Sequence, residues 1–166
     1  MASAGAIAVF QQANIQGEVL FLDSKGGVEV RATFAKLPAG LHGFHIHKAG
    51  DLRGEGCKGA CEHFDVGHSD HGGPPGSDGP RHTGDLGNIR GPSFTRRYFL
   101  NDIDVNDLFG RSVIVHQDKD DLGKGDHEDS KTTGHSGARI GCAIIGRVSC
   151  EHQGGGQKKT RKIKRS

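Results

Sequence analysis

The sequence predicts an all-β domain, an eight-stranded Greek-key sandwich or flattened barrel with two long functional loops. Short segments rich in β-branched and aromatic residues recur along the chain, and no useful length shows the 3.6-residue period of a helix. Twenty-eight glycines and no tryptophan among 166 residues indicate many turns between short strands. Long connections between some of these strands suit a Greek-key arrangement.

The first half of the chain supplies four of the expected strands. Partial alternation of apolar and polar residues predicts strands at residues 7–10, 15–22 and 28–34. The sequence Asp-Ser-Lys-Gly-Gly at 23–27 has strong turn chemistry, so these strands should form a meander. The turn at 38–40 leads into a fourth strand, which contains His45 and His47.

Four more strands are expected in the second half. Residues 94–100 and 103–105 are predicted to form a strand pair, followed by a strand at 111–117 and a last one at 140–148. Two segments without periodicity, 48–85 and 118–139, remain as loops. A loop this long in a compact domain is either functional or a misassignment, and its histidines favour function.

Those histidines predict a metal site. His45 and His47 alternate with Phe44 and Ile46, which on a strand places both imidazoles on one face, although an isolated pair of this kind is a weak signal. The donors His63, His71, His82 and Asp85 follow on a segment too rich in glycine and proline to pack a core. Imidazoles with one carboxylate favour zinc or copper over calcium or magnesium, and three histidines with one aspartate make a closed zinc set.

The chain divides into one domain at 1–150 and a basic tail at 151–166. The formal net charge is only +2, but the tail has six lysines and arginines between Lys158 and Arg165. We expect the tail to be disordered, either as a solvated terminus or as a handle for nucleic acid, for a membrane surface or for localisation.

Composition also limits the location of the protein. No apolar run approaches the roughly 20 residues of a membrane span. Residues 2–10 are too short, and lack the basic start, for a secretion signal. The expectation is a soluble, cytoplasmic protein.

Ordered motifs along the chain resemble the copper/zinc superoxide dismutases. The first is Gly-Phe-His-Ile-His at 43–47, and the others are at 63–64, 71–74, 81–88, 113–116, 120–125 and 137–142. The resemblance covers residues 6–148. It implies a superoxide dismutase that converts superoxide to dioxygen and hydrogen peroxide with copper and zinc as cofactors.

The resemblance also implies the role of each site residue. Copper would be held by His45, His47, His63 and His116, and zinc by His63, His71, His82 and Asp85. His63 would bridge the metals and carry a proton in catalysis, and Arg139 would dock the superoxide anion. Asp120 would join a copper-ligand histidine to a zinc-ligand histidine, here His45 and His71.

The cysteines are interpreted differently with and without the resemblance. Four cysteines in a cytosolic chain would be expected as free thiols or ligands. The resemblance implies a disulfide between Cys57 and Cys142. The roles of Cys61 and Cys150 stay open among free thiols, a second bridge and intermolecular pairing.

The resemblance further implies a homodimer. Ala49 and Arg147 occupy positions of the family's dimer interface where relatives commonly have more apolar residues, so the contact should be less apolar than usual. A copper-delivering chaperone is a candidate partner that the sequence leaves open.

Two other function classes compete with the enzyme. A copper or zinc carrier on the same scaffold would be expected to lose His116, His63 or Arg139, and all three are present. A purely structural or adhesive sandwich gives no reason for the set of metal-ligand residues. The sequence therefore favours the enzyme.

Overall fold

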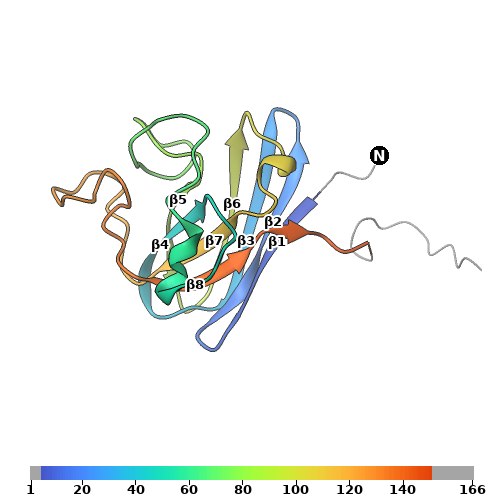
Figure 1. The fold of residues 1–166 in the computed structure, drawn as a ribbon, viewed down its shortest axis with the longest axis horizontal. Helices are drawn as coiled ribbons and strands as arrows, with labels where there is room; N and C mark the ends of the chain where they lie inside the picture. The colour runs from blue at the N-terminus through green and yellow to red at the C-terminus, as the bar shows by residue number, and fades with distance from the viewer. Residues whose placement is uncertain (1–4, 151–166) are drawn as a thin grey trace, which may run out of the picture.

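A computed structural model describes residues 5–150 as two antiparallel β-sheets packed face to face (Figure 1). The five-stranded sheet has the order β6-β3-β2-β1-β9, and the four-stranded sheet has the order β5-β4-β7-β8. The strands are β1 (Gly5–Gln12), β2 (Ile15–Ser24), β3 (Gly27–Lys36), β4 (Gly40–His47), β5 (Asp85–Gly91), β6 (Phe94–Asn101), β7 (Ser112–His116), β8 (Arg139–Ile144) and β9 (Gly146–Arg147). The expected all-β sandwich is confirmed, and the sheets do not close into a barrel.

The first three strands form the predicted meander. Ser24 pairs with Gly27, so Lys25 and Gly26 make a two-residue turn between β2 and β3. Gly26 has φ +83°, a left-handed conformation that glycine adopts without the steric cost of a Cβ. The local turn chemistry therefore sets the register of this hairpin.

The second half of the chain differs from prediction in two places. The strand predicted at 103–105 is wrong, because Val105–Asp107 is a short 3-10 helix (η2). Asp104 caps it by accepting a hydrogen bond from the Asn106 N–H, and the Asp107 side chain accepts one from the Asp104 N–H. The strand β5, Asp85–Gly91, was not predicted, because Gly87 interrupts its alternation and Gly91 ends it.

The last predicted strand, 140–148, is divided between the two sheets. Its first part, β8, pairs with β7, and its second part, β9, pairs with β1. Ile145 separates the parts and is almost completely buried; its N–H donates to Arg111 O, and its carbonyl accepts from the Gly110 N–H. The division at Ile145 accounts for nine assigned strands where eight were expected.

Aromatic residues fill the space between the sheets. The ring centroids of Phe10 and Phe34 lie 5.2 Å apart, and those of Phe34 and Phe44 lie 5.7 Å apart in an edge-to-face contact. Phe44 and Ile46 of β4 are fully buried in this core. The core therefore fixes one face of the strand that carries His45 and His47 on its other face.

The two long loops extend from the part of the molecule formed by the four-stranded sheet, away from β1 and β2 (Figure 1). The first contains a second 3-10 segment, η1 (Glu55–Ala60). The loops contact each other, since the His71 N–H donates to Lys131 O. The structure has no helix in its described part that is long and apolar enough to cross a membrane. The predicted basic tail at 151–166 lies outside the described residues.

Candidate metal centre

Four histidines from three parts of the chain converge on the face of β4 that points away from the core. Ligand nitrogens of His45, His47, His63 and His116 all lie within 4.8 Å of one another. His45 and His47 project from β4, His116 ends β7, and His63 forms an isolated bridge with His47. All four side chains are buried. The structure thus brings together the four residues predicted to hold copper.

Hydrogen bonds to the protein occupy one nitrogen of three of these rings. The Nδ1–H of His47 donates to Cys61 O at 2.8 Å, and the Nδ1–H of His116 donates to Gly137 O at 3.0 Å. Nε2 of His45 lies 2.7 Å from Asp120 Oδ2. The second nitrogen of each ring is therefore left for the cluster, where Nε2 of His47 and Nε2 of His116 are 3.4 Å apart.

Two nitrogen atoms in this cluster have no partner within the protein. His45 Nδ1 and His63 Nε2 are buried and make no hydrogen bond. Such atoms are costly unless a ligand satisfies them, and a lone pair on imidazole nitrogen suits copper. The unsatisfied atoms and the all-imidazole donor set fit a copper ion.

Burial favours the neutral form of these rings. It lowers the pKa of His45 and of His47, and the neighbouring His63 lowers both further. Burial also lowers the pKa of His116 to about 4, despite the hydrogen bond to Gly137 O, which raises it. Neutral imidazoles are the form that binds a metal.

A second cluster lies on the other side of His63. Asp85 Oδ1 is 2.9 Å from Nδ1 of His63, 2.9 Å from Nδ1 of His71 and 3.3 Å from Nδ1 of His82. The Nδ1 atoms of His82 and His63 are 3.3 Å apart. Ligands about 2.0–2.1 Å from a tetrahedral zinc ion lie roughly 3.3–3.4 Å from each other. Asp85 and the three histidines predicted for zinc therefore lie together, with Asp85 Oδ1 2.9–3.3 Å from one nitrogen of each histidine.

His45 also has a nitrogen within 4.8 Å of His63, His71 and Asp85. His82 lies at the same place, with its Nδ1 3.3 Å from both Asp85 Oδ1 and His63 Nδ1. His45 Nε2 is bound to Asp120, which leaves only the buried Nδ1 for a metal.

Asp120 connects the two clusters by contacting one histidine of each. Its Oδ2 lies 2.7 Å from His45 Nε2, and its Oδ1 lies 2.8 Å from His71 Nε2. The carboxylate is fully buried, and its Oδ1 also accepts from the Leu122 N–H at 2.7 Å. Asp120 thereby fixes the orientation of one ring in each cluster, as predicted for this position.

Gly134 makes room for this arrangement. It has φ +71°, and a Cβ at this position would overlap Asp120 Oδ1 and crowd His71 Nε2. No sequence pattern indicated this role, because it depends on where two distant loops meet.

The carboxylates change the proton affinity of the second cluster. Burial lowers the pKa of His71, but hydrogen bonds to Asp120 and Asp85 outweigh it and raise this pKa to about 9. Burial raises the pKa of Asp85, but hydrogen bonds to three histidines lower it far below its usual range. A cation between Asp85 and His71 would take the place of the His71 proton.

Arg139 begins β8 and pairs in register with His116. Its Nη1 donates to Cys57 O at 2.9 Å, and its Nη2 donates to Cys61 O at 2.6 Å. Burial lowers the pKa of Arg139, yet a guanidinium stays charged at neutral pH. The predicted anion-docking residue is therefore a cation held beside the four-histidine cluster.

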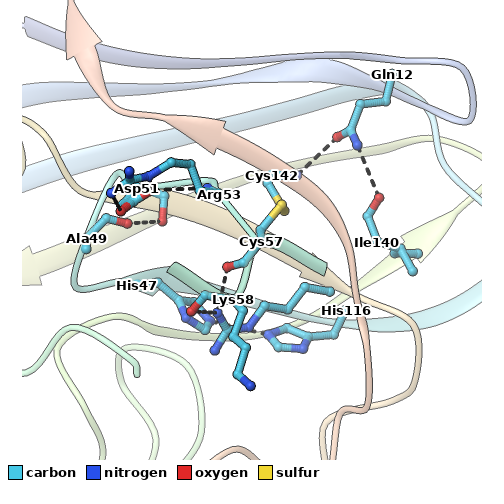
Figure 2. Close-up of a disulfide and its surroundings, with 12 residues drawn as sticks. Gln12, His47, Ala49, Asp51, Arg53, Cys57, Lys58, His116, Ile140 and Cys142 are labelled. Carbon is cyan, nitrogen blue, oxygen red and sulfur yellow. Dashed lines mark hydrogen bonds and ion pairs between the residues drawn. A yellow bond between two sulfur atoms is a disulfide. The ribbon is translucent and has the colours of Figure 1, made fainter. Parts of the chain in front are cut away.

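Cys57 and Cys142 form the predicted disulfide, which joins η1 to β8 (Figure 2). Gln12 supports the same strand: its Nε2 donates to Ile140 O at 3.3 Å, and its Oε1 accepts from the Cys142 N–H at 3.1 Å. Cys61 and Cys150 are free and exposed. Figure 2 shows that the disulfide lies close to His47 and His116.

The sequence interpretation missed His42. Its Nδ1 lies 2.9 Å from His116 O and its Nε2 lies 3.1 Å from Pro38 O, so a buried ring joins the turn before β4 to the end of β7. His42 directly precedes the Gly-Phe-His-Ile-His motif and had no metal-ligand spacing to signal this role.

Comparisons with known proteins agree on one family. The family model described as Copper/zinc superoxide dismutase (SODC) matches residues 15–145. A putative superoxide dismutase [Cu-Zn] of Autographa californica nuclear polyhedrosis virus is 41% identical over 141 residues, covering 80% of this chain and 91% of the viral protein. Superoxide dismutase [Cu-Zn] 2 of Mesembryanthemum crystallinum is 43% identical over 140 residues, 80% of this chain and 88% of the plant protein. A crystal structure of the clock protein EA4 superposes with a TM-score of 0.79 at 37% identity, covering 89% of this chain and 97% of that one.

Proposed function

Because this chain belongs to the copper/zinc superoxide dismutase family, we propose that His45, His47, His63 and His116 hold its copper and that His63, His71, His82 and Asp85 hold its zinc. The protein is a superoxide dismutase, an oxidoreductase that converts two superoxide anions and two protons to dioxygen and hydrogen peroxide. Bound copper supplies the one-electron oxidation and reduction for the two half-reactions, and zinc is redox-inert.

The position of His63 carries the assignment of the shared ligand. Its Nδ1 lies 2.9 Å from Asp85 Oδ1 in the second cluster, and its Nε2 is buried without a hydrogen bond in the first. One ring thus faces both clusters with different nitrogens. Nε2 is the atom at which His63 holds a proton and gives it to the departing peroxide.

Arg139 binds the substrate anion. The guanidinium retains donor capacity beyond its bonds to Cys57 O and Cys61 O. A small anion docked there lies beside His116, which pairs with Arg139 and belongs to the same cluster as His63, so the docking and proton-donating groups act on the same molecule.

The experiment is metal analysis of the purified protein with a superoxide dismutation assay, on wild type and His63→Ala. We expect about one copper and one zinc per chain, and a copper absorption spectrum that shifts when zinc is removed from the wild type. The same treatment should leave the His63→Ala copper spectrum unchanged. A wild-type copper spectrum indifferent to zinc would refute the shared ligand, and metal binding without dismutation would favour a carrier.

A homodimer forms through the surface around β9 and the turn at 109–111. Ile144 is 51% exposed there, Arg147 stacks on the Phe109 ring at 4.7 Å, and Ser112 Oγ donates to the Ala49 carbonyl nearby. An exposed aliphatic side chain beside an arginine on an aromatic ring fits a mixed interface. Sedimentation velocity of Ile144→Asp against wild type tests this, and a wild-type monomer at micromolar concentration would reject it.

The protein functions in the cytoplasm. Two exposed free cysteines, Cys61 and Cys150, fit a reducing compartment. Cell fractionation checks this location, and recovery of the protein only in a secreted fraction would contradict it.

Copper is delivered by a chaperone protein. The copper-site histidines have at most 4% of their surface exposed, so loading requires the loops to open, and a partner could assist this opening. Equal copper content after expression with and without a copper chaperone would contradict this.

The basic tail binds polyanions. Its six lysines and arginines between 158 and 165 supply the charge for attraction that weakens steeply with salt. Full-length protein should be retained on an anionic column at low ionic strength, and protein ending at 152 should not. Equal retention of both forms would reject the role.

A further inference from the structure

A pair of histidines lies outside both clusters, on the second long loop. The rings of His127 and His135 stack with centroids 3.6 Å apart and planes 7° from parallel. Both residues are exposed, and the His135 side chain has 51% of its surface accessible. Two imidazoles are thus held together at the surface, where neither is needed by the copper or zinc centre.

Asp129 orients one ring of the pair. Its Oδ1 accepts from the Nδ1–H of His135 at 2.6 Å, and its Oδ2 accepts from the Thr133 hydroxyl at 3.2 Å. With the proton held at Nδ1, the lone pair of His135 is on Nε2, directed away from the carboxylate. Asp120 relates to the buried His45 and His71 in the same way, and carboxylate–histidine pairs of this kind are typical of metal ligands.

The backbone that carries the pair is fixed by local hydrogen bonds. Ser130 Oγ accepts from the His127 N–H at 3.1 Å and donates to Asp121 Oδ2 at 2.6 Å. The Thr133 N–H donates to Asp129 O at 2.9 Å. The turn from 127 to 135 is therefore already formed, and a ligand bridging the rings would order few additional groups.

We propose that His127 and His135 form a third metal site, which binds a divalent transition-metal ion at the surface of the loop. Two nitrogens about 2.0–2.1 Å from one ion lie roughly 2.9–3.4 Å apart, and the 3.6 Å between the ring centroids shows that the two imidazoles are near enough to share an ion. The stacked rings direct their lone pairs nearly parallel, so metal binding requires the two exposed side chains to turn from the stacked position until both nitrogens face one ion. Water completes the coordination, and Asp129 acts as a positioning residue.

The donor set selects the metal. Neutral imidazole binds copper, nickel and zinc well, and Cu²⁺ binds more tightly than Zn²⁺ at a site without strong geometric constraint. Calcium and magnesium prefer oxygen ligands. We therefore assign the site to Cu²⁺ first and Zn²⁺ second.

The test is equilibrium dialysis of the full-length enzyme, already loaded with one copper and one zinc, against CuCl₂. We expect a third equivalent of metal, with an electron paramagnetic resonance signal distinct from that of the buried copper. His127→Ala and His135→Ala should each weaken its binding by at least roughly tenfold, and Asp129→Asn by about tenfold, within the range for loss of a ligand-orienting partner.

His68→Ala is the matched control. His68 is exposed on the other long loop, and its replacement removes one surface histidine, as each test variant does. It should leave the third equivalent in place. Elemental analysis of the two buried metals and thermal melting show whether each variant is folded and loaded. Uptake of no third equivalent, or equal uptake by wild type and the His127 and His135 variants, would overturn the proposal.

Discussion

At the scale of single residues, Arg139 is held by backbone carbonyl groups rather than by a carboxylate. Backbone carbonyls of Cys57 and Cys61 accept its hydrogen bonds, and no ion pair joins it to a carboxylate within residues 5–150. Carbonyl oxygens fix the guanidinium without neutralising it. Its charge therefore remains available to an anionic substrate.

Arg139→Ala should reduce dismutase activity per copper by roughly 10- to 100-fold, because a hydrogen bond to a charged group contributes about 1.5–3 kcal/mol. Copper and zinc content should be unchanged, since Arg139 is not a ligand. Arg90→Ala, which removes an exposed arginine from β5, is the control for net charge and should retain activity. Wild-type activity per copper in Arg139→Ala would contradict the docking role.

Gly134→Ala should weaken zinc binding, because the added Cβ would displace Asp120 from His71. The free energy of unfolding should fall by the roughly 1–2 kcal/mol cost of a left-handed non-glycine residue, plus about 1–3 kcal/mol for overpacking. Gly26→Ala tests the backbone cost alone, because Gly26 has φ +83° with nothing near its missing Cβ. Zinc competition against a chelator and urea unfolding measure both effects. The explanation fails if the two variants lose equal stability and both keep wild-type zinc affinity.

At the scale of elements, η1 does more than connect strands. It carries Cys57, whose sulfur is bound to β8 and whose carbonyl accepts from Arg139. Arg139 is itself the first residue of β8. The disulfide therefore connects the same two segments that the arginine connects, and it limits their relative movement beside the copper cluster.

Replacing both Cys57 and Cys142 by serine should lower the free energy of unfolding by about 2–5 kcal/mol, as for other native bridges in small domains. Activity per bound copper should also fall, since η1 would no longer be tied to β8. Replacing Cys61 and Cys150 instead removes two thiols without removing a bridge and should leave the melting temperature nearly unchanged. Identical melting of the two double variants would show that the bridge does not stabilise the fold.

Sequence patterns predicted the elements unevenly. The hairpin from β2 to β3 was predictable because its alternation and its Lys25-Gly26 turn are both local. The strand β5 was not, because it is held by pairing with β4, as between His42 and Ile89, rather than by its own propensity. Ile103 and Val105 suggested a strand, yet Asp104 between them caps a turn.

At the scale of the whole molecule, the strands provide four of the seven predicted metal ligands and the first long loop provides the other three. His45, His47 and His116 come from the strands β4 and β7, with Asp85 at the start of β5. His63, His71 and His82 lie on the first long loop, and Asp120 lies on the second. Bound metals would therefore contribute to the stability of the loops more than to that of the sheets.

Removing both metals with a chelator should lower the melting temperature by roughly 5–10 °C, the size of shift expected when a ligand at about 100 times its Kd is lost. Amide hydrogen exchange should accelerate in loop residues 61–84 and 118–138. Amides of the β1–β2 hairpin should serve as the internal control and keep their protection. Equal acceleration in the hairpin and the loops would mean that the metals stabilise the molecule uniformly.

The ligands were easier to predict than the groups that orient them. Histidines and an aspartate at motif spacing can be recognised along the chain, and the structure brings all seven predicted ligand residues into the two clusters. The carbonyl of Cys61, the space at Gly134 and the ring of His42 could not be recognised. Every residue has a backbone carbonyl, so the residue type at position 61 does not mark the acceptor. The space at Gly134 and the position of the His42 ring depend on contacts between segments distant in sequence.

One peptide plane has a mechanical consequence for the reaction. The carbonyl of Cys61 accepts from His47 Nδ1 at 2.8 Å and from Arg139 Nη2 at 2.6 Å, so the proposed copper ligand and the anion-docking group have one acceptor in common. When thermal motion shifts this part of the loop, it shifts both in the same direction. The His47 ring and the Arg139 guanidinium move together. The distance between them therefore changes much less than the position of either one. The spacing between substrate and metal is thereby protected from loop fluctuations that would be large enough to disrupt it if each group had its own support.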